Sequence, residues 1–357
     1  MYKKIKKKCL ASASGRFNDY FKKKTSHSNI NIEKIIGIHV NVIEGCNSRC
    51  LTCEFWKIPI KTLDYNKFKE AIDFSYKLIA NDKEVYITFV GSGEPLLNKN
   101  ICELINYSNS LGLNSSIVTN SLILSKKKLK NLIKSGITFI NLSLESNNPI
   151  INDKIRGIKG HHTRVIKNIE NFEQLQSQEK TKCGLGIMTV VTSYNLDNLV
   201  NLVKWVNEKK IIRNINLSAI NTVFGDQNSI LLKNNTKHNH LWPKNSKIIE
   251  KVYDELIKLK IQNFKILNSI DSLQNQKEFF LNPEKFNNNR FQNIQCNVEN
   301  KITINTDGTI NLCPSIQDNP IKIHENTFFY NKKIIQKLQH DILKCKFQNC
   351  HIKLNCR

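Results

Sequence analysis

The regular alternation of apolar segments with amphipathic helical patterns is the feature that most constrains how this chain folds. Runs typical of strands fall at residues 38–43, 84–90, 115–119, 138–144, 184–191 and 215–220. Apolar residues recur at helical spacing at 68–79, 100–111, 125–134, 163–175, 195–206 and 246–260. Strands that alternate with helices in this way predict right-handed crossovers and a parallel sheet. Six such units are too few for a closed eight-stranded barrel, so we predict a partial, laterally open barrel.

Three cysteines follow the first predicted strand at the spacing C-x3-C-x2-C: Cys46, Cys50 and Cys53. A short loop at the carboxyl end of a strand can wrap its thiolates around one small inorganic cluster. Iron–sulfur cubanes are normally held by four thiolates, so this loop would leave one iron open for an exchangeable ligand. Two other interpretations stay open here, a zinc site with a distant fourth ligand and unliganded thiols. A disulfide framework is disfavoured, because nothing at the N-terminus resembles a secretion signal.

The cysteine spacing resembles that of radical S-adenosylmethionine (SAM) enzymes, in which three cysteines hold a [4Fe–4S] cluster whose open iron binds SAM. A second motif strengthens the resemblance one β–α unit later. There Ser92, Gly93 and Glu94 belong to a Gly-Ser-Gly-Glu variant of the glycine-glycine-glutamate turn that holds the SAM amino group in this family. Arg156 resembles the family's arginine that pairs with the SAM carboxylate. A guanidinium suits that task because its fork binds a carboxylate bidentately.

The resemblance implies a function. The reduced cluster at Cys46, Cys50 and Cys53, the predicted catalytic residues, would cleave SAM to a 5′-deoxyadenosyl radical that abstracts hydrogen from a substrate. A flavodoxin- or ferredoxin-type donor would supply the electron. The expected substrate is a peptide, or a sugar or other small metabolite, that is oxidised or otherwise modified. The alternative carried forward is a zinc-binding protein that interacts with nucleic acid without catalysis.

Further residues near the expected strand ends are candidates for contacts with SAM. Asn120 ends the third predicted strand, and Ser143 and Glu145 end the fourth. Each can hydrogen-bond a ribose or a substrate, although helix capping and turn formation account for such residues about equally well. Phe55 and Trp56 follow the cysteine loop closely and are candidates for packing near the adenine.

Five of the eleven cysteines lie near the C-terminus: Cys296, Cys313, Cys345, Cys350 and Cys356. Residues 301–313 predict a β-hairpin with Asp307-Gly308 as a type I′ turn, which would bring the chain back toward Cys296. The late cysteines resemble the SPASM and Twitch modules of radical SAM enzymes, with a longer spacing before Cys350 than the full SPASM pattern. This resemblance implies an auxiliary [4Fe–4S] cluster. Five thiolates suffice for one such cluster but not for two with complete protein ligation.

We therefore predict an α/β protein in three parts: a basic N-terminal arm at residues 1–35, a TIM-like partial (β/α)6 barrel at 36–262, and a small cysteine-rich module with a β-hairpin at 263–357. The formal net charge of +24 raises the question of nucleic-acid binding. The lysines are spread along the chain without interleaved aromatic residues, which disfavours a specific nucleic-acid partner. No apolar run approaches the roughly 18 residues of a membrane helix, so we expect a cytoplasmic protein without a membrane partner.

Overall fold

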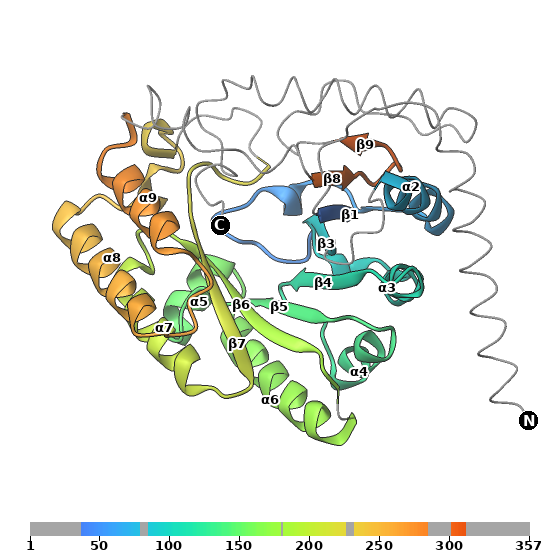
Figure 1. The fold of residues 1–357 in the computed structure, drawn as a ribbon. Helices are drawn as coiled ribbons and strands as arrows, with labels where there is room; N and C mark the ends of the chain where they lie inside the picture. The colour runs from blue at the N-terminus through green and yellow to red at the C-terminus, as the bar shows by residue number, and fades with distance from the viewer. Residues whose placement is uncertain (1–36, 79–84, 180, 226–231, 285–300, 312–357) are drawn as a thin grey trace, which may run out of the picture. The chain divides into compact units, whose positions relative to one another are not determined.

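One mostly parallel sheet organises the computed structural model, which describes residues 37–78, 85–179, 181–225, 232–284 and 301–311 (Figure 1). Its six barrel strands are β1 (Gly37–Gly45), β3 (Tyr86–Gly93), β4 (Asn114–Thr119), β5 (Phe139–Ser143), β6 (Gly184–Val191) and β7 (Ile212–Ala219). Each of these strands pairs in parallel with the next one along the chain. The predicted α/β class and the partial barrel are thus confirmed.

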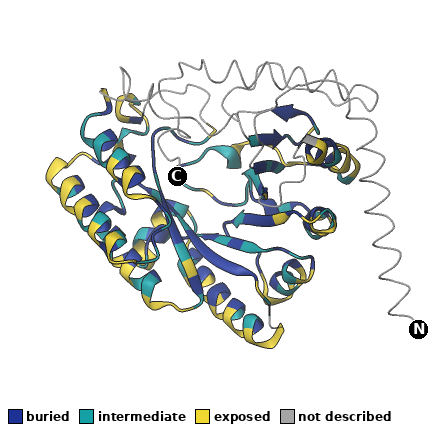
Figure 2. Ribbon diagram, in the orientation of Figure 1, coloured by how far each residue is buried: buried dark blue, intermediate teal, exposed yellow. Residues whose placement is uncertain are grey.

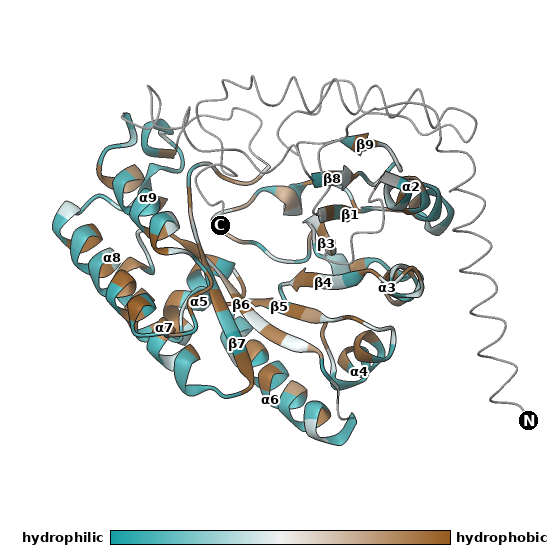
Figure 3. Ribbon diagram, in the orientation of Figure 1, coloured by the Kyte–Doolittle hydropathy of each residue, from teal (hydrophilic) through white to brown (hydrophobic). Residues whose placement is uncertain are grey.

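The connecting helices cover one face of this sheet through their apolar sides. They are α2 (Tyr65–Leu78), α3 (Ile101–Ser110), α4 (Lys126–Lys134), α6 (His161–Glu179) and α7 (Leu199–Glu208). In α7 the inward residues Leu199, Leu202, Val203 and Val206 recur every three or four positions and are at most 1% exposed. Figure 2 shows exposed residues on the outer sides of the helices and buried residues along the strands, and in Figure 3 the strands carry long apolar stretches. Among the described helices none has the length and apolar character needed to cross a membrane.

Helix α8 (Ser246–Ile261), predicted to close the flank of the barrel, packs between α7 and α9 (Ile270–Leu281). Helices α9 and α5 (Pro149–Arg156) had no counterpart among the predicted elements. Helix α5 is short, but its ends are well specified. The side chain of Asn148 accepts hydrogen bonds from the first turn, Pro149 occupies the first helical position, and Gly157 ends the helix with a φ of 65°.

The predicted C-terminal hairpin is present as β8 (Lys301–Ile304) and β9 (Ile310–Asn311), which pair antiparallel. The predicted type I′ turn is wrong. That turn needs positive φ at both central residues, whereas Gly308 (φ 87°) has a positive φ and Asp307 does not. The connection is a five-residue loop, closed by a hydrogen bond from the Asn305 N–H to the Thr309 oxygen (2.8 Å).

The hairpin also joins the barrel sheet, which the sequence did not predict. Strand β8 pairs in parallel with β1, beside a short antiparallel contact of β1 with β2 (Lys61–Thr62). The first barrel strand therefore has neighbours on both sides. The predicted boundary between barrel and C-terminal module at residues 262 and 263 stays a prediction. Cys296, Cys313, Cys345, Cys350 and Cys356 lie outside the described residues.

Candidate active site

The three-cysteine loop leaves the carboxyl end of β1, as predicted. The backbone of Ser48 donates to Cys46 Sγ (3.4 Å), and the Ser48 hydroxyl lies 3.2 Å from Cys50 Sγ. Ser48 itself is 1% exposed. One buried serine thus holds two of the three thiols on the same small loop.

The C-terminal carbonyls of α5 support this loop. The last carbonyls of a helix have no partner within the helix and can accept hydrogen bonds from other segments. The Leu51 N–H donates to the Ile155 oxygen (2.9 Å), and the Ser48 hydroxyl donates to the Arg156 oxygen (3.1 Å). The approach is close, since a Cβ at Gly157 would lie 2.1 Å from the Arg49 oxygen. Gly157 is therefore required twice, for the positive φ that ends α5 and for contact with the cysteine loop.

The segment after β7 holds the far end of the same loop. The Glu54 N–H donates to the Phe224 oxygen (2.7 Å), and the Phe224 N–H donates to the Thr52 oxygen (3.0 Å). A Cβ at Gly225 would lie 2.8 Å from the ring of Phe55, so this predicted adenine contact packs against the segment after β7. These contacts fix the chain on both sides of Cys53.

The second predicted aromatic residue, Trp56, lies under two cations. The Arg49 guanidinium carbon is 4.9 Å from the Trp56 ring centre, and the Lys57 ammonium is 5.4 Å from it. Such cation–π contacts favour one position of the indole on the cysteine loop.

The glycine-rich turn after β3 joins the cysteine loop to its neighbour strand. A Cβ at Gly93 would lie 1.9 Å from the Gly45 oxygen, so small residues there allow β1 and β3 to approach closely. Ser92, the second residue of the Gly-Ser-Gly-Glu motif, is half-buried and pairs with Glu44 in the same ladder.

Glu94 is buried and ties the end of β3 to the end of β4. Its carboxylate accepts from the Thr119 hydroxyl (2.6 Å), the Asn120 N–H (2.6 Å) and the Leu96 N–H (3.1 Å). Burial raises the pKa of Glu94, and these donors oppose the rise. A carboxylate offers about four acceptor positions, so three donors leave about one of them for a ligand.

Arg156 and Glu145 form a buried ion pair next to the cysteine loop. Arg156 Nη1 lies 3.2 Å from Glu145 Oε1, with the two side chains 11% and 2% exposed. The other Glu145 oxygen accepts from the Val190 N–H (2.7 Å). Arg156 Nε is buried and has no hydrogen-bond partner in the part of the chain that the structure describes. Glu145 thus holds one part of the guanidinium and leaves another donor uncommitted.

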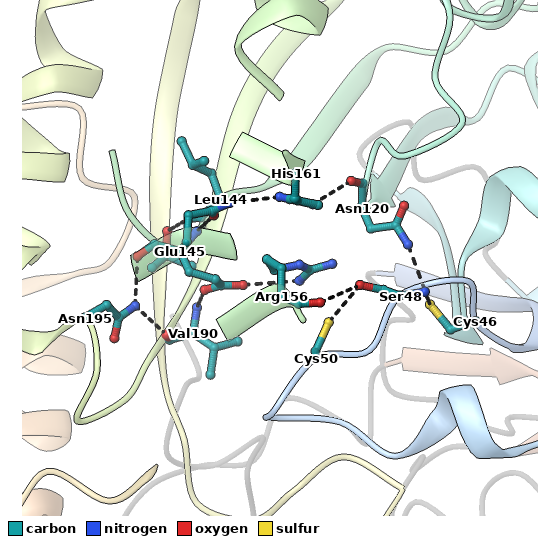
Figure 4. Close-up of polar contacts among 12 residues, drawn as sticks. Cys46, Ser48, Cys50, Asn120, Leu144, Glu145, Arg156, His161, Val190 and Asn195 are labelled. Atoms are coloured by element: carbon teal, nitrogen blue, oxygen red, sulfur yellow. Dashed lines mark hydrogen bonds and ion pairs between the residues drawn. The ribbon is translucent and has the colours of Figure 1, made fainter. Parts of the chain in front are cut away.

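A chain of buried amides connects the two sides of the site (Figure 4). Asn120 Nδ2 donates to Asn47 Oδ1 (2.8 Å) and lies 3.6 Å from Cys46 Sγ. The Asn120 oxygen lies 2.9 Å from His161 Nε2, and His161 Nδ1 lies 3.0 Å from Asn152 Nδ2. Asn152 in turn accepts from the Glu145 N–H (3.0 Å). The hydrogen-bonded chain thus links Cys46 to the backbone of Glu145, whose carboxylate pairs with Arg156.

His161 within this chain is neutral. Burial, followed by the nearby charge of Arg156, lowers the pKa of His161 to about 3. A carbonyl oxygen can only accept, so Nε2 carries the ring proton and Nδ1 accepts from the Asn152 amide.

The three cysteines of the loop are partly buried. Burial raises the pKa of Cys53 to about 12 and also raises that of Cys46. No three His, Cys, Asp or Glu side chains in the described part of the chain converge on one point as a single metal ion requires.

The structure brings most of the predicted site residues to the carboxyl ends of β1, β3, β4 and β5. Ser143 is the last residue of β5, and its side chain makes no hydrogen bond among the described contacts. Sequence analysis missed the supporting residues Asn47, Ser48, Asn152 and His161. The capping pattern of α5 was the available signal, since Asn148-Pro149 is typical of a helix start and Gly157 of a helix end.

The comparisons with known proteins agree with this geometry. Residues 40–206 match the radical SAM superfamily. This part of the chain is therefore similar to radical SAM domains. Protein MJ0907 of Methanocaldococcus jannaschii is 33% identical over 177 residues, which cover 47% of this chain and 57% of that protein. Fe-coproporphyrin III synthase of Methanosarcina barkeri is 27% identical over 176 residues, or 48% of this chain and 41% of the synthase. The chain thus spans about half the length of the curated relatives it matches.

Solved structures with a similar fold include two of Streptococcus suis SuiB. Streptococcus suis SuiB bound to S-adenosylmethionine superimposes with a TM-score of 0.61 at 17% identity, covering 90% of this chain and 72% of SuiB. SuiB bound to its precursor peptide SuiA gives the same TM-score at 16% identity, with 90% and 71% covered.

Proposed function

We propose that this protein is a radical SAM enzyme in which Cys46, Cys50 and Cys53 hold a [4Fe–4S] cluster and Arg156 binds the carboxylate of SAM. One observation carries the proposal: the cysteine loop rests on the end of α5, where a buried guanidinium has an uncommitted Nε. A buried donor without a partner costs about 1–3 kcal/mol. A carboxylate ligand would remove that cost with a charge-assisted hydrogen bond.

The residues present fit such a cluster and its ligand. Three thiols lie on one loop. The Ser48 N–H and the Asn120 amide donate to Cys46 Sγ, and Cys50 Sγ lies within hydrogen-bond distance of the Ser48 hydroxyl. When bound, the reduced cluster supplies the electron that cleaves SAM. Arg156 orients the carboxylate, and Glu145 fixes the guanidinium by pairing with its Nη1. Glu94 retains acceptor capacity for an ammonium group.

The substrate belongs to one of two classes. Relatives include the PqqA peptide cyclase of Rhodopseudomonas palustris and the mycofactocin maturase MftC of Mycolicibacterium smegmatis, as well as the GTP 3′,8-cyclase of Helicobacter pylori. Peptides and small molecules are therefore both candidate substrates. A flavodoxin- or ferredoxin-type donor would deliver the electron in either case.

The test is SAM cleavage by the anaerobically reconstituted protein. With dithionite the wild type should form 5′-deoxyadenosine, and Cys50→Ala should lose this activity together with the roughly four irons of this cluster. Cys102→Ala is the matched control, because Cys102 lies on α3 outside the loop, and it should behave as wild type. Wild-type cleavage by Cys50→Ala, or bound zinc without iron, would reject the proposal and favour the zinc-protein alternative.

We also propose one auxiliary [4Fe–4S] cluster held by four of the five C-terminal cysteines, as the SPASM-like pattern implies. At four irons per cubane, wild type should contain about eight irons per chain. A Cys296→Ala/Cys313→Ala variant should contain about four and still cleave SAM. About four irons in both proteins would contradict the auxiliary cluster while leaving the radical SAM assignment intact.

A further inference from the structure

Three asparagines share the face of the sheet that points away from the helices. Asn141 of β5 and Asn214 of β7 both pair with Gly186 of β6 in one row, and Asn216 pairs with Met188 in the next. The alternate residues of β7, Ile215 and Leu217, are fully buried on the helix side. Side chains alternate along a strand, so Asn214 and Asn216 face inward with Asn141.

Two of these asparagines carry acceptors that nothing satisfies. Asn216 is 6% exposed. Its Oδ1, like that of Asn214, is buried without a hydrogen-bond partner among the described residues. A buried acceptor left unpaired costs about 1–3 kcal/mol. Native proteins keep few such atoms, and a ligand is one reason to keep them.

Gly186 allows the amides of the two neighbouring strands to lie close together. A Cβ at this position would lie 2.7 Å from the Phe139 ring, 2.8 Å from Asn214 Oδ1 and 2.9 Å from Asn141 Oδ1. Two amide oxygens from different strands thus lie beside one residue that has no side chain.

The surroundings of the three asparagines are uncharged. From the Asn141 row to the carboxyl ends of the strands, the inward residues of β5, β6 and β7 are Ser143, Met188, Val190, Asn216 and Ser218. A fully charged group here would lose its hydration without gaining a counter-ion, which is costly. The amides instead match N–H or O–H groups that carry no charge.

The asparagines also lie close to the proposed SAM site. Asn216 pairs with Met188, which precedes Val190 by two residues on β6. The Val190 N–H donates to Glu145, the partner of Arg156. At about 3.3 Å per residue, the Met188–Asn216 pair and Val190 are about 7 Å apart along the strand. A substrate group held by the asparagines would therefore lie near the proposed SAM site.

We infer that Asn141, Asn214 and Asn216 bind an uncharged N–H or O–H group of the substrate, either a peptide amide or a sugar hydroxyl. The inference rests on the proposed radical SAM function and narrows its substrate. The inner face of the sheet would then select substrates by hydrogen bonds to their uncharged groups.

The experiment compares reconstituted full-length wild type with Asn214→Leu and Asn216→Leu, since Leu nearly matches the shape of Asn. Asn131→Leu, at an exposed position on α4, is the control. Two probe panels are added to the SAM cleavage assay, acetylated tripeptide amides of uncharged residues and neutral hexoses. The panel that accelerates 5′-deoxyadenosine formation by wild type identifies the source of the group. The ratio of rates with and without that probe should fall at least tenfold in either variant and stay unchanged in the control.

Thermal unfolding provides a second measurement that needs no substrate. Removing an unpaired buried acceptor should raise the Tm of each variant by about 2–4 °C, the shift that roughly 1 kcal/mol gives in a domain of this size. A fall in Tm would mean that the amides are satisfied structurally and would overturn the inference. If Leu prevents folding, Asn216→Asp keeps the shape and should transfer the acceleration to amine-bearing probes.

The remaining outcomes separate this inference from the function on which it rests. Wild type that neither holds iron nor cleaves SAM would reject the radical SAM proposal. Wild type that cleaves SAM but responds to neither neutral panel, or responds only to charged probes, would reject the asparagine site alone. Acceleration that persists in both Leu variants would reject it equally.

Discussion

Replacing His161 by Phe should destabilise the protein strongly at neutral pH. The imidazole is fully buried, and its two nitrogens satisfy the Asn120 oxygen and the Asn152 amide. Phenylalanine fills a similar space but leaves both groups unpaired. At about 1–3 kcal/mol for each, the free energy of unfolding should fall by about 2–6 kcal/mol. Small domains have only about 5–15 kcal/mol in total.

The loss should shrink as the pH falls. The pKa of His161 is about 3 in the folded protein, below its ordinary value of 6.5. Between these two pH values His161 is protonated in the unfolded chain but not in the folded protein. The free energy of unfolding of the wild type therefore declines by up to about 1.4 kcal/mol for each unit by which the pH falls. The variant lacks this contribution. The gap between the two proteins should therefore narrow by about 2 kcal/mol from pH 7 to pH 5.

Anaerobic urea titrations at pH 7, 6 and 5, followed by circular dichroism, measure this gap. His39, whose pKa is also lowered by burial to about 4, contributes equally to both proteins and cancels in the difference. His162→Phe is the control, because the neighbouring ring has no part in the chain from Asn120 to Asn152. A gap that stays constant with pH would show that His161 is not held neutral. Equal stabilities at pH 7 would show that its two hydrogen bonds are not formed.

Two further sets of substitutions test the close approach of β1 and β3 and the ion pair between Arg156 and Glu145. Gly93→Ala places a methyl group 1.9 Å from the Gly45 oxygen, so it should force β1 and β3 apart and abolish iron incorporation into the cysteine loop, as measured by iron and sulfide analysis. Gly112→Ala, also at a glycine but with open space around it, should cost only about 1–2 kcal/mol of backbone strain and keep its iron. Arg156→Leu strands the buried Glu145 carboxylate and should lower the free energy of unfolding by about 3–5 kcal/mol. A double variant that also carries Glu145→Leu should recover most of this loss in urea titrations; no recovery would mean that the pair is not coupled.

Sequence periodicity predicted the barrel well because its strands are long, apolar and regularly separated by amphipathic helices. It failed for α5, whose eight residues are too few to show a helical period. The capping residues Asn148 and Gly157 carried the information instead. The hairpin turn was misassigned because Asp-Gly is compatible with more than one turn, and loop length decides among them.

The candidate site was predictable where chemistry depends on residue type and spacing. Cysteine spacing and the glycine-rich turn located the loop and its neighbour strand. The supporting layer was not predictable, because Asn120, His161 and Asn152 meet only after β4, α6 and α5 pack together. No local pattern marks a histidine that will be neutral and buried.

The parallel pairing of β8 with β1 has a consequence during synthesis of the chain. The two strands are about 260 residues apart in sequence. At about 5–20 residues per second, a ribosome needs roughly 13–50 s to make the intervening chain. Throughout that time the N-terminal half of β1, which carries Ile38 and Val40, presents unpaired backbone groups along one edge. Such edges recruit other strands, so the nascent barrel is exposed to aggregation until its last strand emerges.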